Sequence, residues 1–493
     1  MRILYIDIDS LRPDHLGCYG YHRNTSPNID ALAAAGVRFE NCYVSNAPCL
    51  PSRTALWSGQ FGFRTGVVGH GGSAAEPFIE GSRRGFRGAL GETSWMSALG
   101  QAGYRTVTVS SFAGRHSAWH WYAGYNEIYN PGLGGMDRAD QVAPIALAWL
   151  AQNGRADNWF LHVNFWDPHT PYRTPLAYGE PFAGEPLPAW YTETLRRRLW
   201  EGFGAHSPQE PHGYPHQEWY APSYEDFPRV PEQLDSMENV RRWIDGYDTG
   251  IRYVDDYVGR LLEALEELGV LEETAIIVGA DHGENQGELN VWGDHHTADH
   301  VTCRVPLIVR WPGGQARVDD ALHYQFDCAA TVIELAGGEV PEKWDGRSFA
   351  DAFRTGQTAG RDYLVLSQGA WACQRSVRFN DDGQAYLCMR TFHAGHKALE
   401  DLMLFNLTQD PREEESVAPT RPALVDRAMG HLAAWHHDMM VRSHTDVDPL
   451  MTVLREGGPE HTRGQLAPYL EHLRRTGRSH HAERLARQYP QEV

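Results

Sequence analysis

The chain has 493 residues, of which 42% are hydrophobic and 22% charged, so it can bury a large core and is neither disordered nor fibrous. Its formal net charge of -20 argues against a nucleic-acid binder that relies on a broad cationic surface. All but two of the 44 basic residues are arginines, which suit a bidentate grip on oxyanions; the two lysines are Lys343 and Lys397.

The sequence shows no targeting or anchoring segment. Residues 1–9 have the pattern of a strand and not of a secretion signal, and no apolar run approaches the roughly 18 residues of a membrane span. The seven cysteines are scattered without C-x-x-C spacing, which indicates a reducing compartment and no structural zinc. We therefore expect a cytoplasmic protein without nucleic-acid or membrane partners, and we leave a homo-oligomer open.

Short apolar runs alternate with helical patterns along most of the chain, which is typical of crossover units and a largely parallel sheet. Strands are predicted at residues 1–9, 105–110, 159–165 and 275–280. Helices are predicted at 28–35 behind Ser26-Pro27, at 93–103 with Thr93 as the cap, and at 251–268 from apolar three-and-four spacing.

Two later regions differ from this pattern. Residues 171–232 are rich in proline, histidine and aromatics, which indicates a lid or binding wall or, equally, a surface insertion. After about residue 360, alternating segments at 363–367, 385–390 and 402–407 predict a small antiparallel sheet, followed by helices. We predict a catalytic α/β domain over 1–360 and a C-terminal subdomain with a helical tail over 361–493.

Polar clusters follow three of the predicted strands, namely Asp9-Ser10, Asp167-Pro168-His169 and Asp281-His282. Ligands gather outside the carboxyl ends of strands in open α/β sheets. Three strand ends that deliver carboxylates and imidazoles into one crevice predict a divalent metal site. Asp7 stands two residues before Asp9 on the same face of the predicted strand and further from the strand's end. We expect it to be a buried structural carboxylate.

The most specific motif is Cys49-Leu50-Pro51-Ser52-Arg53. With Pro51 in the first turn, it stands at the start of a predicted helix, whose free N–H groups and positive dipole end face residue 49. Such a position stabilises an anion. The alternative is a small buried cysteine without chemistry, the usual fate of a lone cysteine.

At these residues the sequence resembles the formylglycine-dependent sulfatases of the alkaline phosphatase superfamily. The matching stretches stand in the family's order: 3–20 with Asp14-His15-Leu16-Gly17-Cys18-Tyr19-Gly20, 49–56, 103–106, 167–172 with Asp167-Pro168-His169, 255–256, 279–284 with Asp281-His282-Gly283, 304–307 and 404–411. The resemblance implies an alkaline-phosphatase-like fold, with a mostly parallel central sheet flanked by helices and a smaller C-terminal subdomain that contains an antiparallel sheet.

The resemblance also implies a mechanism. Cys49 would be oxidised to formylglycine by a formylglycine-generating enzyme, and the aldehyde would hydrate to a geminal diol. One diol oxygen attacks sulfur, and deprotonation of the other collapses the covalent intermediate, so no water has to attack it. A bound metal lowers the pKa of the attacking oxygen and draws charge from the sulfuryl oxygens.

Carried over residue by residue, the resemblance assigns the metal ligands and the catalytic groups. The implied ligands of one divalent ion are Asp9, Cys49, Asp281 and His282. Arg53 matches the arginine that holds the diol, and His169 matches a histidine that contacts the sulfate or serves as an acid. Calcium is the expected ion, and manganese or magnesium are alternatives.

The sequence departs from the family's pattern at three places. Ser10 stands where a second ligand often follows the first aspartate, which weakens the coordination. The family's Lys-x-His pair is absent, and we assign its catalytic roles to Arg115 and His116. A later lysine is also absent, and His295 and His296 are the substrate-binding candidates in its place.

Three functional hypotheses follow. The first is hydrolysis of a small-molecule or carbohydrate sulfate ester; the alternative is a phosphonate monoester or phosphodiester hydrolase of the same superfamily. The third is a noncatalytic anion-binding relative whose Cys49 stays a thiol. Trp119 and Trp121 could form a sugar platform or simply belong to the core, and the Arg/His-rich residues 474–481 could lie at a subunit interface or on a solvated helix face.

Overall fold

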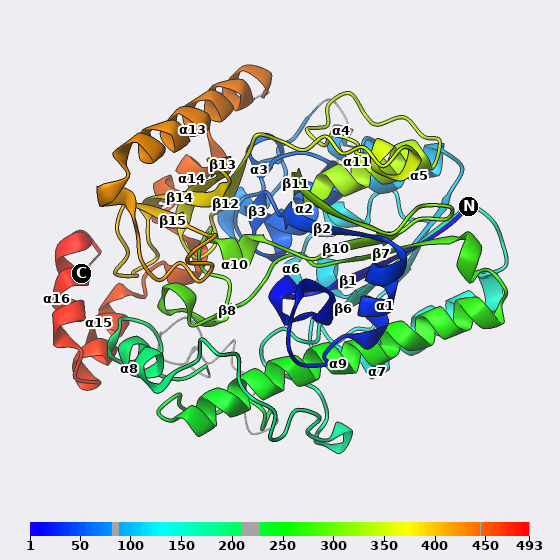
Figure 1. Cartoon of the computed structure of the whole chain (residues 1–493). Coiled ribbons are helices and arrows are strands. Elements are labelled where there is room, and N and C mark those ends of the chain that lie inside the picture. The colour runs from blue at the N-terminus through cyan, green and yellow to red at the C-terminus, as the bar shows by residue number, and fades with distance from the viewer. Residues whose placement is uncertain (81–87, 209–226, 444, 493) are drawn as a thin grey trace.

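The computed structural model describes residues 1–80, 88–208, 227–443 and 445–492. An eight-stranded sheet in the order β11-β2-β10-β7-β1-β6-β4-β5 forms its centre (Figure 1). Its strands are β1 (Arg2–Ile8), β2 (Val37–Tyr43), β4 (Arg105–Val109), β5 (Glu127–Tyr129), β6 (Trp159–Phe165), β7 (Thr274–Gly279), β10 (Leu307–Arg310) and β11 (Arg317–Tyr324). Strand β1 pairs in parallel with β6 and β7, while β10 runs antiparallel to β7 and β2. The predicted largely parallel sheet is confirmed.

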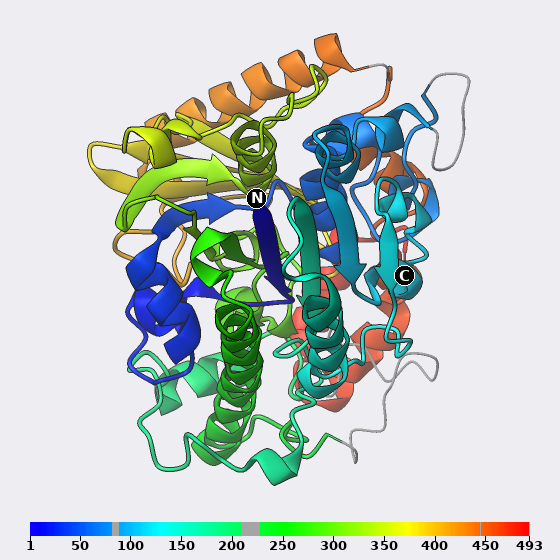
Figure 2. The same cartoon turned by 90° about the vertical axis from the view of Figure 1, so that its right-hand side faces the viewer.

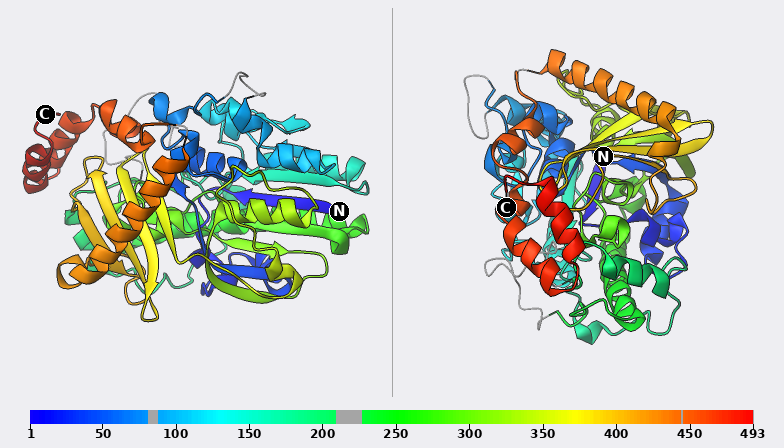
Figure 3. Two further views of the ribbon diagram at one scale, coloured as in Figure 1. Left: turned by 90° about the horizontal axis from the view of Figure 1, so that it is seen from above. Right: turned by 90° about the vertical axis from the view of Figure 1, so that its left-hand side faces the viewer.

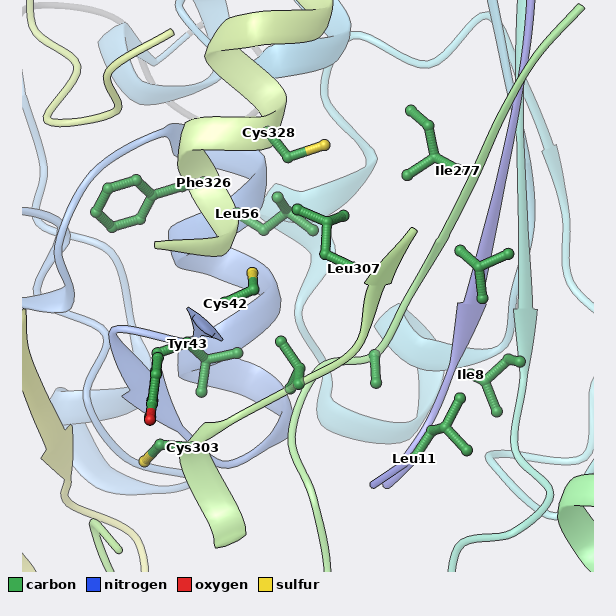
Figure 4. Packing of buried hydrophobic residues seen from close by; sticks show 14 of the residues in the cluster. Ile8, Leu11, Cys42, Tyr43, Leu56, Ile277, Cys303, Leu307, Phe326 and Cys328 are labelled. Atoms are coloured by element: carbon green, nitrogen blue, oxygen red, sulfur yellow. The ribbon is translucent and has the colours of Figure 1, made fainter. Parts of the chain in front are cut away.

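The central strands are buried along their whole length, because helices cover both faces of the sheet. Every residue of β1, β6 and β7 is buried. One face carries α1 (Pro27–Ala35), α7 (Ala139–Asn153) and α9 (Met237–Glu267), and the other carries α2 (Cys49–Ser58), α5 (Trp95–Gln101) and α11 (Gln325–Leu335) (Figure 2). Figure 4 shows part of this core, where Leu56 of α2 and Cys328 of α11 lie near Leu307 of β10.

The second sheet has five strands in the order β15-β14-β13-β12-β3. Its strands are β3 (Asn46–Ala47), β12 (Tyr363–Gln368), β13 (Cys373–Asp381), β14 (Gln384–His393) and β15 (Leu402–Asn406). The four C-terminal strands are antiparallel, as predicted, but β3 comes from the segment just before Cys49 and pairs in parallel with β12. The sequence pattern did not indicate β3, because two residues are too few to show alternation.

Helices complete the C-terminal part, at the end of the molecule opposite the N-terminus (Figure 3). They are α13 (Pro422–Arg442), α14 (Pro449–Arg455), α15 (Leu466–Arg475) and α16 (Ser479–Gln488). Arg478, between the last two helices, is buried and donates to the carbonyl oxygens of Gly202 and Gly204 at 2.9 and 2.5 Å. This arginine therefore holds the tail against the chain, whereas Arg474 and Arg475 are exposed.

Short elements fill the connections. They are α3 (Gly62–Thr65), α4 (Ala89–Glu92), α6 (Phe112–His116), α8 (Glu193–Glu201), α10 (His300–Cys303), α12 (Asp351–Arg354), and the hairpin of β8 (Asn285–Gln286) and β9 (Trp292–Asp294). The cap of α5 differs from the prediction: Ser94 accepts from the N–H of Ser97 at 3.1 Å, while the Thr93 hydroxyl bonds to Ala89 of the preceding α4. Across the described ranges, no helix combines the length and the apolar character that crossing a bilayer requires.

The predicted lid or insertion at 171–232 is partly packed into the core. Tyr172 and Leu195 are buried in the main cluster, and Thr192 caps α8 by accepting from the N–H of Leu195. Residues 209–226 of this segment lie outside the described residues. The described part is therefore attached to the body of the domain by apolar contacts.

Candidate active site

The polar clusters that follow β1, β6 and β7 lie together, because these strands are neighbours and their carboxyl ends share one edge of the sheet. The backbone N–H of Asp9 donates to the carbonyl of Phe165 at 2.9 Å, which holds the first two strand ends side by side. Ser52 of α2 donates to the carbonyl of Asp281 at 2.6 Å and fixes the helix start against the third. Cys49, the first residue of α2, is buried between them with 2% exposure.

Four potential metal ligands converge at this point. One ligand atom from each of Asp9, Cys49, Asp281 and His282 lies within 4.8 Å of the others. The His282 Nε2 atom is 3.1 Å from Cys49 Sγ, 3.4 Å from an Asp281 oxygen and 3.9 Å from an Asp9 oxygen. The geometry thus gathers the four residues that the sequence predicted as ligands.

The orientation of His282 fits a cation. Its Nδ1 atom lies 2.8 Å from the carbonyl oxygen of Gly283 and must donate to it, so in the neutral ring Nε2 carries a lone pair. That lone pair faces the carboxylates of Asp9 and Asp281. Electron pairs that face one another in a buried site repel unless a positive ion lies between them, so these residues fit a divalent metal.

The charges of the buried groups also favour a divalent metal ion. Arg53 donates from Nε to Asp7 at 3.0 Å and from Nη1 to Asp9 at 3.0 Å, and Nη1 also bonds to Asp281. Three buried carboxylates against one guanidinium leave two negative charges, which a divalent cation would neutralise. Asp7 also binds Arg53, but it lies outside the four-ligand cluster. The sequence predicts it to be a buried structural carboxylate.

Burial and neighbouring charges shift the pKa values of these groups. Burial and the neighbouring Asp9 raise the pKa of Asp281 to about 7, although Arg53 opposes the shift. Burial also acts on Asp9, but the charges of Arg53 and nearby imidazoles outweigh it and hold the pKa of Asp9 below its usual value. Burial together with Asp9 and Asp281 raises the pKa of the Cys49 thiol well above its ordinary value.

Ser10, which stands where the family often has a second ligand, supports the carboxylates in the structure. Its hydroxyl donates to Asp9 at 2.9 Å, and its backbone N–H donates to Asp281 at 3.2 Å. Its φ of 60° lies in the left-handed region, which turns both donors toward the site. Ser10 therefore orients two ligands of the cluster.

His169 lies around the same point, as do Arg115 and His116 of α6. The Nδ1 atom of His169 donates to the carbonyl of Thr170, and its Nε2 is 4.0 Å from Asp9. Arg115 lies over the Trp166 ring at 5.3 Å, and its charge acts on the Cys49 thiol. The Nε2 atom of His116 and the Nη2 atom of Arg53 are buried without a hydrogen-bond partner among the described residues.

His295 and His296 have different surroundings. The His295 ring is 4.0 Å from the His282 ring, and His295 forms a second potential ligand group with Cys49 and His282. His296 stacks on Trp371 at 4.5 Å instead. Adjacent residues of an extended chain point to opposite sides, so only His295 lies beside the metal cluster.

Three further residues, His70, His461 and Lys397, are buried or partly buried and have no signal in the sequence. His70 accepts from the Leu50 N–H at 3.5 Å and contacts His461 at 2.9 Å. Lys397 is buried, which lowers its pKa to about 7 against the opposing charge of Asp294. His70 and Lys397 lie in loops and His461 in the short 3-10 helix Glu460–Thr462, and no spacing pattern connects them along the chain.

Trp119 and Trp121, the two tryptophans of the predicted sugar platform, differ in their exposure. Trp121 is 4% exposed and packs against His162 and Tyr125 in the core, whereas Trp119 is 54% exposed. Trp121 is therefore a core residue, and the pair does not form one platform.

Comparison with known proteins identifies the family of this chain. The family model named Sulfatase matches residues 2–338, and the one described as N-sulphoglucosamine sulphohydrolase, C-terminal, matches residues 287–424. The chain therefore belongs to the sulfatase family of the alkaline phosphatase superfamily. The predicted fold is confirmed by solved structures.

Curated relatives are similar at low identity. Human arylsulfatase A is 26% identical over 354 residues, which cover 69% of this chain and 64% of that protein. The choline-sulfatase of Rhizobium meliloti is 26% identical over 481 residues, with 87% and 84% covered. The chain thus spans just under two thirds of the first of these relatives.

Two solved structures show the same fold. A protein solved in complex with its substrate D-glucosamine-2-N,6-O-disulfate has a TM-score of 0.69 at 18% identity and covers 91% of this chain and 99% of its own. The phosphonate monoester hydrolase of Silicibacter pomeroyi has a TM-score of 0.64 at 19% identity, with 92% and 97% covered.

Proposed function

We propose that this protein hydrolyses sulfate esters, with residue 49 converted to formylglycine and a divalent cation, calcium in the first instance, held by Asp9, Cys49, Asp281 and His282. The observation that carries the proposal is the buried cluster of these four groups at the start of α2, beside the unpartnered Nη2 of Arg53. A cation bound there would act as a Lewis acid on the ester oxygens, and hydrated formylglycine would supply the nucleophilic oxygen.

The surroundings of Cys49 support its conversion. Since burial and two carboxylates raise the pKa of the thiol, and Arg53 and Arg115 offset only part of the shift, an unmodified thiol would stay protonated in the metal-free protein. The thiolate is the nucleophilic form of cysteine. A buried neutral thiol in this position would therefore be a poor nucleophile.

Arg53 and Arg115 supply positive charge on the substrate side of the site. Asp7 and Asp9 fix two nitrogens of the Arg53 guanidinium, so the third nitrogen, Nη2, stays available to donate to an oxyanion of the ester. Arg115 adds a second cation near residue 49. In this proposal Arg115 supplies the positive charge of the family's missing Lys-x-His pair, and Arg53 keeps the role of the family's arginine.

His169 is the proposed acid for the leaving oxygen, and His116 is the second candidate. Burial lowers the pKa of His169 to about 3, so its Nε2 carries a lone pair in the free protein. The negative ester would raise this pKa when it binds, since an anion nearby favours the protonated imidazole. Substrate binding and protonation of His169 are thus coupled.

The function is tested by comparing esters on one preparation made with a formylglycine-generating enzyme. We expect kcat/KM for 4-nitrophenyl sulfate to exceed that for a phenylphosphonate monoester by at least about tenfold, and a chelator to abolish turnover. The reverse preference would establish the phosphonate or phosphodiester hydrolase. Protein whose Cys49 stays a thiol in this preparation and that turns over neither ester would point to the anion-binding relative.

His169→Ala should affect esters according to their leaving group. Alkyl sulfates need a proton on the departing oxygen, so we expect their kcat to fall by about 10² to 10³. The 4-nitrophenolate ion leaves without protonation, and its ester should lose less than about tenfold. Stopped assays of both esters give the ratio, and an equal loss for both would exclude the acid role.

A further inference from the structure

Arg53 has one carboxylate partner that lies outside the metal cluster. Its other two partners, Asp9 and Asp281, belong to the four-ligand cluster, so a bound cation would share their oxygens with the guanidinium. The Oδ2 atom of Asp7 accepts from Arg53 Nε at 3.0 Å. Asp7 can therefore hold Arg53 in one orientation whether or not a cation is bound.

Asp7 is itself held by a histidine of the neighbouring strand. The Nε2 atom of His162, on β6, lies 3.3 Å from Asp7 Oδ2, the same oxygen that accepts from Arg53. Asp7 Oδ1 has no hydrogen-bond partner among the described residues. The orientation of this carboxylate therefore depends on the contacts of Oδ2, and His162 supplies one of them.

The two ring nitrogens of His162 have different roles. A carboxylate only accepts hydrogen bonds, so Nε2 carries the proton and donates to Asp7. In the neutral ring Nδ1 then has a lone pair, which accepts from the Thr108 hydroxyl at 2.9 Å. Burial lowers the pKa of His162, which keeps the ring neutral. The hydrogen bonds thus run in one direction, from Thr108 through His162 to Asp7.

The central sheet brings these three side chains to one face. His162 is in register with Tyr5 of β1 and with Thr108 of β4, the strands on either side of β6. Asp7 stands two residues after Tyr5, so both side chains point to the same side of the sheet. Thr108, His162 and Asp7 are all buried, with 3% exposure or less. Backbone pairing of three neighbouring strands therefore sets the positions of the row.

Aromatic rings surround the row and leave little free space. A cavity of about 10 Å³ borders Asp7, Arg53 and His162, and Trp57 and Trp121 belong to its walls. This volume is about what one water molecule needs. The Asp7 carboxylate therefore has little room to turn while the imidazole is in place, and loss of the ring would open that room.

We propose that His162 is a positioning residue of the sulfatase site, which acts through Asp7 to keep the Arg53 guanidinium directed at the ester. This inference rests on the proposed sulfate-ester hydrolysis and adds to it a supporting row behind the metal cluster. Thr108 orients the ring, and the ring orients the carboxylate. Loss of the ring lets the guanidinium tilt, so the charge that develops on the ester oxygens in the transition state is stabilised less.

Variants of His162 test this role, with activity expressed per formylglycine in each preparation. We expect His162→Leu to lower kcat/KM for 4-nitrophenyl sulfate by about 10- to 100-fold, since a donor to the ester is misplaced. His162→Gln offers an amide N–H in place of Nε2–H and should recover most of this loss. Equal losses in the two variants would exclude the hydrogen bond to Asp7 as the cause.

His323→Leu is the matched control. His323 is also buried, and its Nε2 atom lies 3.3 Å from Asp319 on β11, at the far edge of the same sheet. Its replacement removes the same kind of contact without touching the partners of Arg53. We expect unchanged kcat/KM per formylglycine, and chemical unfolding measures the stability of each variant.

A double-mutant cycle with Asp7 separates positioning from a general loss of structure. If the ring acts through the carboxylate, it has no further effect once the carboxylate is removed. Adding His162→Leu to Asp7→Val should therefore change kcat/KM by less than about twofold. Losses that multiply in the double variant would overturn the proposal.

The outcomes distinguish this inference from the proposed function. Wild-type protein that turns over 4-nitrophenyl sulfate, together with an equally active His162→Leu variant, would refute only the positioning role. Wild-type protein with formylglycine that hydrolyses no sulfate ester would refute the proposed function itself, and the role of His162 with it.

Discussion

Replacing Cys49 by alanine should lower kcat/KM for aryl sulfates by roughly 10⁴-fold or more, because the proposed covalent route has no other nucleophile. The mass of the tryptic peptide that spans residues 39–53 reports the chemical state of residue 49 in the same preparation. In the wild type we expect the mass of an aldehyde in place of one thiol. The alanine variant should keep the folded state, since removal of a thiol from this position leaves Arg53 and its partners unchanged.

Cys42 provides a matched control, since it lies in the same peptide and is also fully buried with a raised thiol pKa. Cys42→Ala should retain turnover and the modified residue 49. Full activity of Cys49→Ala, or equal loss in both variants, would contradict the assignment of the nucleophile.

Asp281→Asn should abolish calcium binding and turnover while it stabilises the metal-free protein. The variant removes one of the two unbalanced negative charges that the metal would otherwise neutralise. Calorimetric titration with calcium measures the first effect, and chemical unfolding in the presence of a chelator measures the second. Unchanged calcium affinity, or a metal-free variant less stable than the wild type, would contradict the proposed site.

The stabilisation of the metal-free Asp281→Asn protein should increase with pH. The pKa of Asp281 is about 7 in the fold against an ordinary value of 3.8, so its ionisation costs stability as pH rises from about 4 and the full cost is present above 7. At pH 8 the variant should exceed the wild type by roughly 1 to 3 kcal/mol in free energy of unfolding, and at pH 4 the difference should vanish. Burial raises the pKa of Glu284 to about 8, so only the difference between the two proteins isolates Asp281.

The sheet and the metal cluster could be predicted from the sequence because each depends on local pattern. Buried parallel strands are continuous apolar runs, and their carboxyl ends share an edge, so Asp9, Asp281 and His282 were found without a structure. Asp7 is on the same face of the strand as Asp9 but two residues further from its end, which explains why it was predicted to lie inside.

The rest of the site depends on contacts between distant segments. His461 meets His70 because α14 packs across the loop at 68–74, and neither residue lies in a periodic or spaced motif. The choice between His295 and His296 depends on which way one loop residue turns, which composition does not determine. Strand β3 pairs with a partner more than three hundred residues later, and its two residues carry no alternation.

The pairing of β3 with β12 determines when an enzyme can reach the Cys49 thiol. Residue 49 follows β3 directly and is 2% exposed once Asn46 and Ala47 pair with Ser367 and Gln368. Any enzyme that oxidises the Cys49 thiol must therefore reach it before β12 has been synthesised and has paired. If Cys49 is converted as proposed, its conversion competes with folding, and a chain that pairs β3 with β12 first would keep the thiol.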